Sequence, residues 1–366
     1  MADGAGLVST ADPRLAWQEA LQAGLVGLTQ DPLNCEVPSE LLDAEVTPAR
    51  LFFRRNHFAI PLLDASAWRL EIGGLVRCPM SLSLDELKRF GSVSTVAVLE
   101  CAGNGRSSYV PAVPGEQWGL GAVGNARWTG VRLADVLAAA GLRRGAVEVV
   151  FRGADQGTVS GSAATIAFER SLCVADARYA GALLAFAMND EPLPARHGHP
   201  VRLVVPGKYA VASVKWLTGI TVTSTRFDGF FQAEHYVFKW PRGGDDARQP
   251  VAGPAVRALI TAPATGDQLP HAAVRVRGVA WSGVAPVTQV EVSVADGPWQ
   301  VATLAGRPAT HGWRRWELTA RPAGPGEVTI RARATDAAGR TQQVQPEWNR
   351  LGYGGNFIHA VTVLLR

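Results

Sequence analysis

The sequence contains few cysteines, and their spacing excludes two kinds of protein. Only four occur in 366 residues, at Cys35, Cys78, Cys101 and Cys173, and no two of them form a Cys-x-x-Cys pair. A zinc ribbon needs such pairs, and a disulfide-stapled fold needs a denser set of cysteines. We therefore expect the thiols to be reduced and available for other roles.

Long apolar runs, targeting signals and nucleotide-binding loops are also missing. No apolar stretch approaches the ~18 residues that cross a membrane, and the N-terminus lacks the pattern of a secretory signal. We therefore predict a cytoplasmic protein without a membrane partner. The net charge of +4 does not by itself indicate a nucleic-acid partner. Neither a Gly-x-Gly-x-x-Gly loop nor a P-loop occurs, which argues against nucleotide binding by those routes.

The residue pattern divides the chain into three parts. Residues 1–50 are punctuated by prolines and predict an N-terminal arm with few strands. Residues 51–245 mix short strands with helical segments, which is typical of an α+β domain. A linker rich in Gly and Pro lies at 239–255. Residues 252–366 alternate polar and apolar residues between regular turns, which predicts an immunoglobulin-like β-sandwich.

Local patterns predict individual elements within these parts. The segments TVAVLEC, VEVVFRG and VRLVVPG predict strands, and LSLDELKRF and RLADVLAAAG predict helices, the second ending at Gly141. The sequences at 295–297 and 336–339 predict hairpin turns. The glycine-rich stretch 346–359 predicts a loop that leaves the sandwich and reaches back to the first domain.

The stretch LECAGNGRS places Cys101 between an apolar run and a glycine-rich turn. The small residues around Cys101 leave its sulfur open to a ligand, and Arg106 and nearby N–H groups would favour the thiolate. Three roles remain open on this pattern: a nucleophile assisted by His57 or His197, a ligand to a soft metal, or a buried structural thiol.

Three other segments gather polar groups among apolar neighbours. FFRRNHFAIP (52–61) is compatible with an oxyanion clamp or with surface ion pairs. RHGHPVRLVVPGKYAVASVKW (196–216) carries enough basic residues to resemble an anion site. In FFQAEHYVFKW (230–240), Tyr236 follows a histidine among aromatic residues, where packing is the commoner role of a tyrosine.

Together these segments resemble the sulfite oxidase family of molybdenum-cofactor enzymes, over essentially all of residues 50–366. Seven stretches match in the family's order: FFRRNH, LECAGNGRS, ARWTGVRLADVL, MNDEPLP, RHGHPVRLVVPG, SVKWLTGI and PEWNRLG. The resemblance implies an α+β molybdopterin-binding domain followed by an immunoglobulin-like dimerisation domain, and therefore a homodimer. It also implies oxidation of sulfite to sulfate by oxygen-atom transfer.

The resemblance implies a set of cofactor residues. Cys101 corresponds to the thiolate that ligates molybdenum. His57 corresponds to a residue that helps to hold the cofactor. His197, Arg202 and Lys215 correspond to the residues that hold the pterin and its terminal phosphate, which suits charge-assisted donors.

The resemblance also implies a substrate pocket beside the metal. Arg55, Arg106 and Trp118 correspond to residues that line this pocket, and Tyr236 corresponds to the active-site tyrosine of the family. Positive charges there suit a small oxyanion such as sulfite. No haem-attachment motif or haem module occurs in the sequence, so electrons are expected to leave to an external acceptor.

Three positions depart from the animal members of the family. Gly105 stands in place of a second arginine, Lys208 in place of a small apolar residue, and Leu351 in place of an arginine from the second domain. We expect these changes to lie around the substrate pocket. An alternative is therefore an enzyme of the same fold that acts on another oxo-substrate, by S-oxide or nitrate reduction. A metal-free thiol hydrolase and a non-enzymatic scaffold are the alternatives from other classes.

Overall fold

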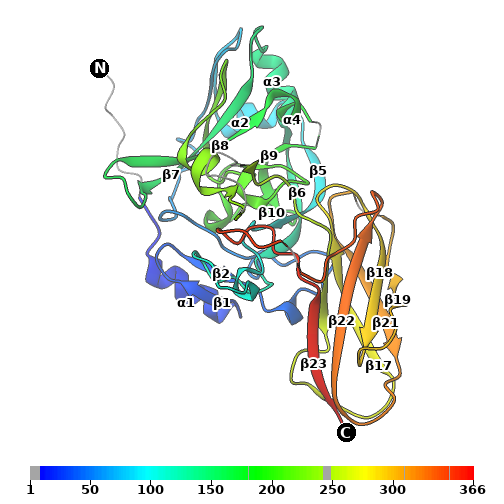
Figure 1. Cartoon of the computed structure of the whole chain (residues 1–366). Helices are drawn as coiled ribbons and strands as arrows, with labels where there is room; N and C mark the ends of the chain where they lie inside the picture. The colour runs from blue at the N-terminus through cyan, green and yellow to red at the C-terminus, as the bar shows by residue number, and fades with distance from the viewer. Residues whose placement is uncertain (1–8, 180, 242–248, 309, 346) are drawn as a thin grey trace.

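In the computed structural model, the chain forms an α+β domain and a β-sandwich that pack side by side (Figure 1). The structure describes residues 9–179, 181–241, 249–308, 310–345 and 347–366. The fold class predicted from the sequence is confirmed. Within the described residues, no helix is long and apolar enough to cross a membrane.

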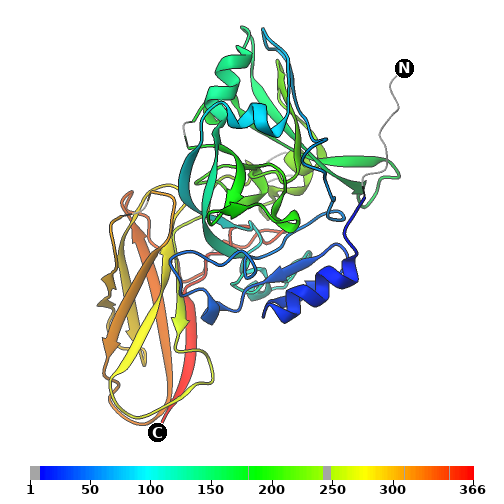
Figure 2. The same cartoon turned by 180° about the vertical axis from the view of Figure 1, so that it is seen from behind.

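The N-terminal part of the chain is folded onto the first domain. Its elements are the helix α1 (Pro13–Gln22), the strands β1 (Val26–Thr29) and β2 (Asn34–Glu36), and the 3₁₀ turn η1 (Ser39–Leu41). Figure 2 shows α1 and the β1–β2 hairpin along the outer edge of that domain. Cys35 pairs with the backbone of Arg54 in both directions, each N···O distance being 2.9 Å. This pairing ties the hairpin to the segment that contains the RRNH motif.

Two five-stranded sheets form the first domain. One sheet has the order β10-β9-β6-β5 with β11 paired to β9, and the other has the order β4-β3-β12-β7-β8. The strands are β3 (Leu70–Gly74), β4 (Met80–Leu82), β5 (Val93–Glu100), β6 (Val123–Arg132), β7 (Glu148–Thr158), β8 (Thr165–Cys173), β9 (Leu183–Met188), β10 (Glu191–Pro192), β11 (Arg202–Val204) and β12 (Leu217–Thr223).

Short helices connect these strands. They are α2 (Leu84–Lys88), η2 (Arg106–Ser108), α3 (Leu133–Ala140), α4 (Val174–Ala177), η3 (Ala195–His197), η4 (Ala210–Ala212) and the π-helical turn η5 (Phe231–His235). The two predicted helices are confirmed. Ser83 and Glu86 form a capping box at the start of α2, and α3 ends at Gly141 with a φ of 66°.

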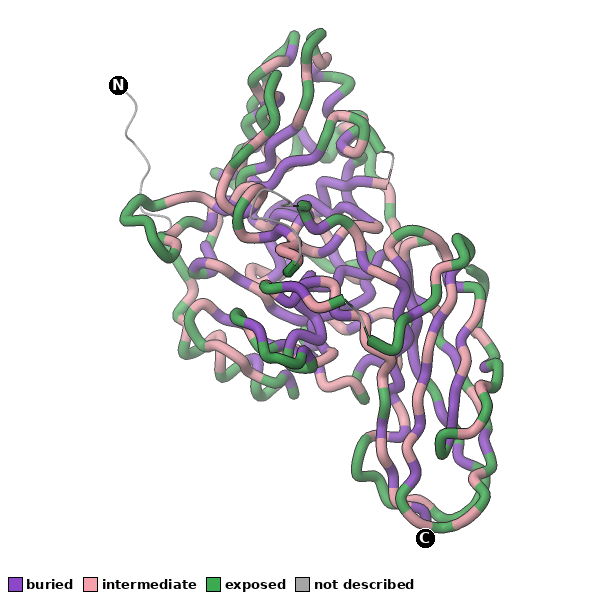
Figure 3. The backbone as a smooth tube through the Cα atoms, viewed as in Figure 1, coloured by how far each residue is buried: buried purple, intermediate pink, exposed green. Residues whose placement is uncertain are grey.

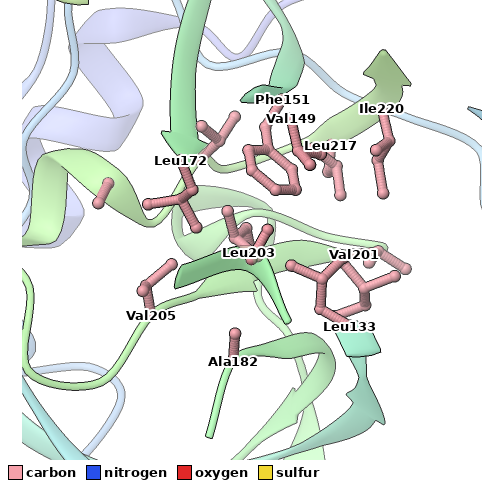
Figure 4. Packing of buried hydrophobic residues seen from close by; sticks show 14 of the residues in the cluster. Leu133, Val149, Phe151, Leu172, Ala182, Val201, Leu203, Val205, Leu217 and Ile220 are labelled. Atoms are coloured by element: carbon pink, nitrogen blue, oxygen red, sulfur yellow. The ribbon is translucent and has the colours of Figure 1, made fainter. Parts of the chain in front are cut away.

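Apolar side chains from both sheets meet in the core of the first domain. Figure 4 shows residues of β7 and β12 facing Leu203 of β11 and Leu133 of α3 across this core. Phe151, Leu203 and Ile220 there have no exposed surface. Burying such side chains is the main source of stability, and it fixes the strand ends that carry the polar residues of the site.

The second domain consists of two sheets, as the alternating sequence predicts, and their strands pair antiparallel except for β16, which pairs with β23 in parallel. One has the order β15-β17-β21-β20 and the other β16-β23-β22-β18-β19. Every second residue of β22 is buried, and Figure 3 shows this alternation along the sandwich strands. The strands are β15 (Arg257–Ala262), β16 (Gln268–Leu269), β17 (Val274–Trp281), β18 (Val287–Val294), β19 (Gln300–Val301), β20 (Thr303–Leu304), β21 (Arg314–Ala320), β22 (Gly326–Asp336) and β23 (His359–Leu365).

The segment between the two domains is partly ordered by strand pairing. Strand β13 (Val237–Phe238), directly before the predicted linker, pairs with β14 (Gln249–Pro250) within it, and residues 242–248 lie outside the described residues. The predicted hairpin at 295–297 joins β18 to β19, with positive φ angles at Ala295 and Asp296.

A buried glutamate joins the two domains directly beneath the predicted cofactor thiol. Glu100 ends β5, and its carboxylate accepts a hydrogen bond from the Trp281 indole N–H at 2.8 Å. The same carboxylate pairs with Arg257 at 3.4 Å, and both partners belong to the second domain. A buried carboxylate needs such partners, so the sandwich helps to hold the turn that follows Glu100.

The loop before β23 makes a second contact between the domains, as the sequence predicts. It crosses back toward the first domain in Figure 1. The Arg106 Nε donates to the Leu351 carbonyl at 3.1 Å, and the Tyr109 hydroxyl donates to the Tyr353 carbonyl at 3.0 Å. The second domain therefore contributes residues to the neighbourhood of Arg106.

His359 in β23 makes the stability of the protein depend on pH. Its Nδ1 accepts the buried N–H of Ile260 at 3.0 Å, and burial together with the Arg257 cation lowers its pKa from 6.5 to about 4. The unfolded chain therefore binds more protons than the native protein between these two values. We expect stability to fall as the pH drops from about 6.5 toward 4, by at most roughly 3 kcal/mol from this group.

The thermal midpoint measured at pH 7.5 and at pH 5 checks this expectation. Other buried histidines with lowered pKa values change stability in the same direction, so a control must isolate His359. In the variant His359→Asn, the side-chain oxygen can accept from Ile260 without titrating. We expect a smaller acid-induced drop in this variant, and an equal drop in both proteins would contradict the assignment.

Candidate cofactor and substrate site

Two cavities in the first domain meet at Cys101. The inner cavity, of about 680 Å³, is lined by His57, His197, Arg202, Ser213 and Lys215 among others. The outer cavity, of about 620 Å³, is lined by Arg106, Trp118, His235, Leu351 and Tyr353 among others. Three residues line both cavities, namely Arg55, Cys101 and Tyr236. The cofactor and substrate residues predicted from the sequence therefore fall on two sides of one thiol.

The glycine-rich turn after β5 explains how Cys101 and Arg106 come close together. The Cys101 N–H donates to the Ala122 carbonyl at 2.9 Å, which fixes the start of the turn. A Cβ atom on Gly103 would lie 2.8 Å from the Arg106 guanidinium, and one on Gly115 would lie 3.0 Å from it. The absence of side chains at both glycines makes room for the arginine.

The surroundings of Cys101 shift the pKa of its thiol in opposite directions. Burial raises the pKa of the thiol, whereas the Arg55 and Arg106 cations and the Gly103 N–H lower it. As expected, Arg106 and the Gly103 N–H favour the thiolate. Burial has the larger effect, so the pKa of the thiol is raised overall. A bound metal cation would reverse the balance, because a coordinating thiol is deprotonated outright.

A buried arginine at the inner cavity has no carboxylate partner among the described residues. Arg202 donates from its guanidinium to the carbonyls of His197 and Ser213, both at 3.0 Å, and lies 5.0 Å from the Trp128 ring centroid. Burial lowers its pKa to about 9. A buried cation without a counterion is costly, so this cavity wall favours an anionic ligand.

Lys215 and His197 complete this wall of the inner cavity. The Lys215 ammonium donates to the Arg55 carbonyl at 3.1 Å and to the Asn56 side-chain oxygen. The His197 Nε2 donates to the Ala49 carbonyl at 2.9 Å, and burial keeps the pKa of this histidine well below 6.5. The neutral ring therefore has its Nδ1 lone pair left as an acceptor.

Asp155 also lines the inner cavity, and the sequence reasoning missed it. It lies within β7 at the irregular pairing with β8, and its Oδ1 is buried without a hydrogen-bond partner. Burial raises its pKa to about 7, against the attraction of the Lys215 cation. An unpaired buried carboxyl oxygen is suited to accept from the N–H groups of a ligand. Its position in FRGADQG, just after an apolar strand, was the available signal.

A chain of hydrogen bonds runs between the two cavities through His57. The Arg55 Nη2 lies 3.1 Å from the His57 Nδ1, and the His57 Nε2 lies 2.8 Å from the Tyr236 hydroxyl. Burial and the Arg55 cation lower the pKa of His57 well below 6.5, so the ring is neutral. With Arg55 donating to Nδ1, Nε2 carries the proton and donates to the phenolic oxygen.

The N-terminal hairpin supports this chain through a residue that the sequence reasoning missed. Asn34 has no exposed surface, and its Oδ1 accepts from the Arg55 Nη1 at 3.3 Å and from the Asn56 N–H at 2.8 Å. Its Nδ2 donates to Glu116 at 3.2 Å, and Glu116 also lines the outer cavity. Asn34 therefore holds a cation and an anion of the site in place.

We expect Asn34→Ala to weaken the site through Arg55. The change leaves one guanidinium N–H and the buried Asn56 N–H without their acceptor, a loss of about 1–3 kcal/mol. The KM for an anionic substrate should rise about tenfold, with a smaller change in kcat. Steady-state kinetics at matched cofactor content measures this, and Asn356→Ala, in the second domain, serves as the control. An unchanged KM would contradict the role.

The outer cavity combines the cations Arg55 and Arg106 with the Glu116 carboxylate and with neutral aromatic and apolar side chains. Arg106 donates to the Leu351 and Glu116 carbonyls at 3.1 and 3.0 Å. Trp118 is fully buried, and its indole N–H has no partner, which leaves a donor in the wall. Burial and nearby cations lower the pKa of His235 to about 4, so this ring is neutral at pH 7. The arrangement suits a small oxyanion.

Of the three departures noted in the sequence, only Leu351 lines this outer cavity. Lys208 instead forms a salt bridge with Asp176 at 2.9 Å. Gly105 has a φ of +85°, and a Cβ atom there would lie 2.9 Å from the Gly355 carbonyl of the second-domain loop. The expectation that all three changes surround the substrate pocket is therefore wrong for Gly105 and Lys208.

The geometry separates the three roles left open for Cys101. Among the described residues, no histidine is hydrogen-bonded to the thiol, since His57 bonds to Arg55 and Tyr236 and His197 to Ala49. A thiol hydrolase needs such a base within reach. A purely structural thiol would not lie where two cavities meet. The arrangement favours a metal ligand.

The donor set indicates how such a metal would be held. Among the residues that the structure describes, no group of three or more His, Cys, Asp and Glu side chains could bind a metal ion. One soft thiol can hold a soft metal only if a second molecule supplies further ligands. The inner cavity offers that molecule the cations Arg202 and Lys215 and the unpaired oxygen of Asp155. Fold and site thus define a protein in which one thiolate and a separately bound anionic cofactor would hold a metal.

Comparisons with known proteins agree with this class. Residues 57–231 match the oxidoreductase molybdopterin binding domain, and residues 249–365 match the Mo-co oxidoreductase dimerisation domain. The chain is 38% identical to the mitochondrial sulfite oxidase of Macaca fascicularis, over 98% of this chain and 69% of that protein. It is 30% identical to the sulfite oxidase of Arabidopsis thaliana, over 92% and 93% of the two chains.

A solved structure agrees as well. The sulfane dehydrogenase SoxCD of Paracoccus pantotrophus superimposes with a TM-score of 0.81 at 25% identity, over 98% of this chain and 92% of that one. The chain belongs to the sulfite oxidase family of molybdenum-cofactor oxidoreductases.

Proposed function

We propose that this protein oxidises sulfite to sulfate with a molybdenum cofactor and passes the electrons to an external acceptor. The observation that carries the proposal is the position of Cys101 between a cationic inner cavity and an outer cavity that Arg55 and Arg106 line. The overall change is SO₃²⁻ + H₂O → SO₄²⁻ + 2H⁺ + 2e⁻. When bound, the cofactor would supply the oxygen-transfer and redox chemistry.

The inner cavity is proposed to hold the cofactor. Cys101 would be the thiolate ligand of molybdenum, and His57 would contact the cofactor beside it. His197, Arg202 and Lys215 would bind the pterin and its terminal phosphate. A phosphate there would give Arg202 the counterion that the described residues do not provide.

The outer cavity is proposed to bind the substrate. Arg55 and Arg106 would attract the anion, and the unpaired indole N–H of Trp118 would donate to one of its oxygens. The Tyr236 hydroxyl, which accepts from His57, would hold a proton at the junction of the cavities. Fixed donors of this kind need no reorganisation when the charge of the bound anion changes.

Sulfite-dependent reduction of ferricyanide, with molybdenum quantified by mass spectrometry on the same sample, tests the proposal. Turnover with near-stoichiometric metal is the expected result. Metal without sulfite turnover would favour the alternative of another oxo-substrate, for which S-oxides and nitrate are the comparison acceptors. A protein that carries no metal after expression in a cofactor-competent host would overturn the assignment of the inner cavity.

Three further features belong to this proposal. The match of residues 249–365 to a dimerisation domain supports a homodimer, and a solution mass near that of one 38.9 kDa chain would contradict it. A cytochrome, another carrier or oxygen would accept the electrons, and no haem is expected in this chain. A cytoplasmic location stays a prediction, which cell fractionation tests.

A further inference from the structure

A second buried arginine lies beside the site, and the function proposed above assigns it no role. Arg170 in β8 is only 4% exposed. Among the described residues, no carboxylate lies within salt-bridge distance of it, and its Nε has no hydrogen-bond partner. Its guanidinium lies 5.7 Å from the centroid of the Tyr236 ring. A neutral side chain of similar length would fill this space at less cost, so the charge itself calls for an explanation.

Arg170 contacts the segment that carries Tyr236 at two places. The π-helical turn η5 runs from Phe231 to His235 and ends directly before Tyr236. Arg170 donates to the Phe231 carbonyl at the start of this turn and lies against the Tyr236 ring at its end. A π-helical turn is rare and is frequent at functional sites. The arginine therefore spans the whole turn that positions the tyrosine.

The Tyr236 ring has a second contact, with a residue of the second domain. The Tyr353 ring is stacked on it with a centroid distance of 5.2 Å and an angle of 25°. The Arg106 guanidinium in turn lies 5.0 Å from the Tyr353 centroid. Each of the two rings therefore has an arginine against it, and a cation against an aromatic face is an attractive contact.

We propose that Arg170 and Tyr353 are positioning residues for Tyr236, which clamp its ring through a cation–π contact and a ring-stacking contact. The clamp keeps the Tyr236 hydroxyl at the 2.8 Å contact with His57 and at the junction of the two cavities. Because Tyr353 comes from the second domain, packing of the two domains sets the orientation of a residue of the site. This inference deepens the function proposed above, and the kinetic test of the inference rests on that function.

The kinetic test compares Arg170→Met, which removes the charge, with Arg170→Lys, which retains it. We expect kcat for sulfite to fall about tenfold in Arg170→Met with a smaller change in KM, and Arg170→Lys to recover part of the loss. The matched control is Arg152→Met, an exposed arginine on the adjacent strand β7, whose kcat should not change. All variants are compared at equal molybdenum content.

A double variant separates positioning from general packing. If Arg170 acts through Tyr236, then adding Arg170→Met to Tyr236→Phe should cause little further loss of kcat. Fully additive losses would overturn the proposal, and so would equal activities of the methionine and lysine variants. If Arg170→Met does not fold, Tyr353→Leu tests the same clamp through the stacking contact, with Tyr353→Phe as the variant that keeps the stacked ring.

A spectroscopic readout makes the test independent of turnover. The chain has five tyrosines, so ¹⁹F NMR of protein labelled with 3-fluorotyrosine should show five resonances, of which Tyr236→Phe identifies one. We expect this resonance to shift in Arg170→Met and in Tyr353→Leu, while the resonance of the partly exposed Tyr179 stays in place. An unmoved Tyr236 resonance in both variants would overturn the clamp, whether or not the protein oxidises sulfite.

Discussion

The Cys101→Ser protein is expected to lose more than about 99% of its sulfite-oxidising activity while keeping its fold. A serine oxygen is a hard donor and a poor replacement for a thiolate at a soft metal. Loss of an outer partner of a metal site already costs about 10- to 100-fold, and loss of the ligand itself should cost more. Serine is close to cysteine in size, so packing at the junction of the two cavities should be preserved.

Activity, molybdenum content and pterin content of the same Cys101→Ser sample measure this effect. We expect most of the pterin to remain, because Arg202, Lys215 and Asp155 contact the inner cavity independently of the thiol. Cys78→Ser is the matched control, because this thiol is exposed and should be replaceable without loss. Persistent turnover in Cys101→Ser would show that the thiol is not the metal ligand.

The Arg202→Met protein is expected to lose the cofactor itself. In the wild type, a bound phosphate would pair with a guanidinium that has no carboxylate partner among the described residues. Removing one partner of a buried ion pair costs about 3–5 kcal/mol, because the other charge is left uncompensated. This corresponds to a fall in cofactor affinity of roughly 10²- to 4 × 10³-fold. Activity per bound molybdenum should change much less than the cofactor content.

Pterin released from purified protein, quantified against protein concentration, measures the loss. Arg144→Met provides the control, because Arg144 is exposed and lines neither cavity. A thermal unfolding curve should show that the cofactor-free Arg202→Met protein is folded, since methionine can fill the space against Trp128. Full cofactor content in this variant would place the terminal phosphate elsewhere.

Motifs in the sequence singled out Cys101, the proposed cofactor thiol, together with residues that line the same cavities. LECAGNGRS, RNH and SVKW each combine residue types whose chemistry is specific, and their order along the chain is informative. Period-two alternation predicted the sandwich, because the two faces of a strand meet different environments. The capping residues Ser83 and Gly141 marked the helices, since these positions act within a few residues of chain.

Other parts of the site depend on contacts between residues far apart in sequence. Asn34, Arg170 and Tyr353 have no motif that marks them, and each acts by lying against Arg55 or Tyr236. The neighbours of Arg170 in AFERSLC, Glu169 and Ser171, gave no sign that the side chain would lie against a tyrosine ring. Such a role is created only when β8 and the π-helical turn are brought together.

The directions of individual side chains were decided by the tertiary structure as well. Arg54 and Arg55 are adjacent, yet Arg54 points to Glu19 and the Ala16 carbonyl of α1, while Arg55 faces both cavities. Lys208 pairs with Asp176 and so lies away from the outer cavity. By itself the sequence determined which chemical groups the protein has and in what local structure. Only the packing of sheets and domains decided which of them face one another, because that depends on contacts that no local pattern encodes.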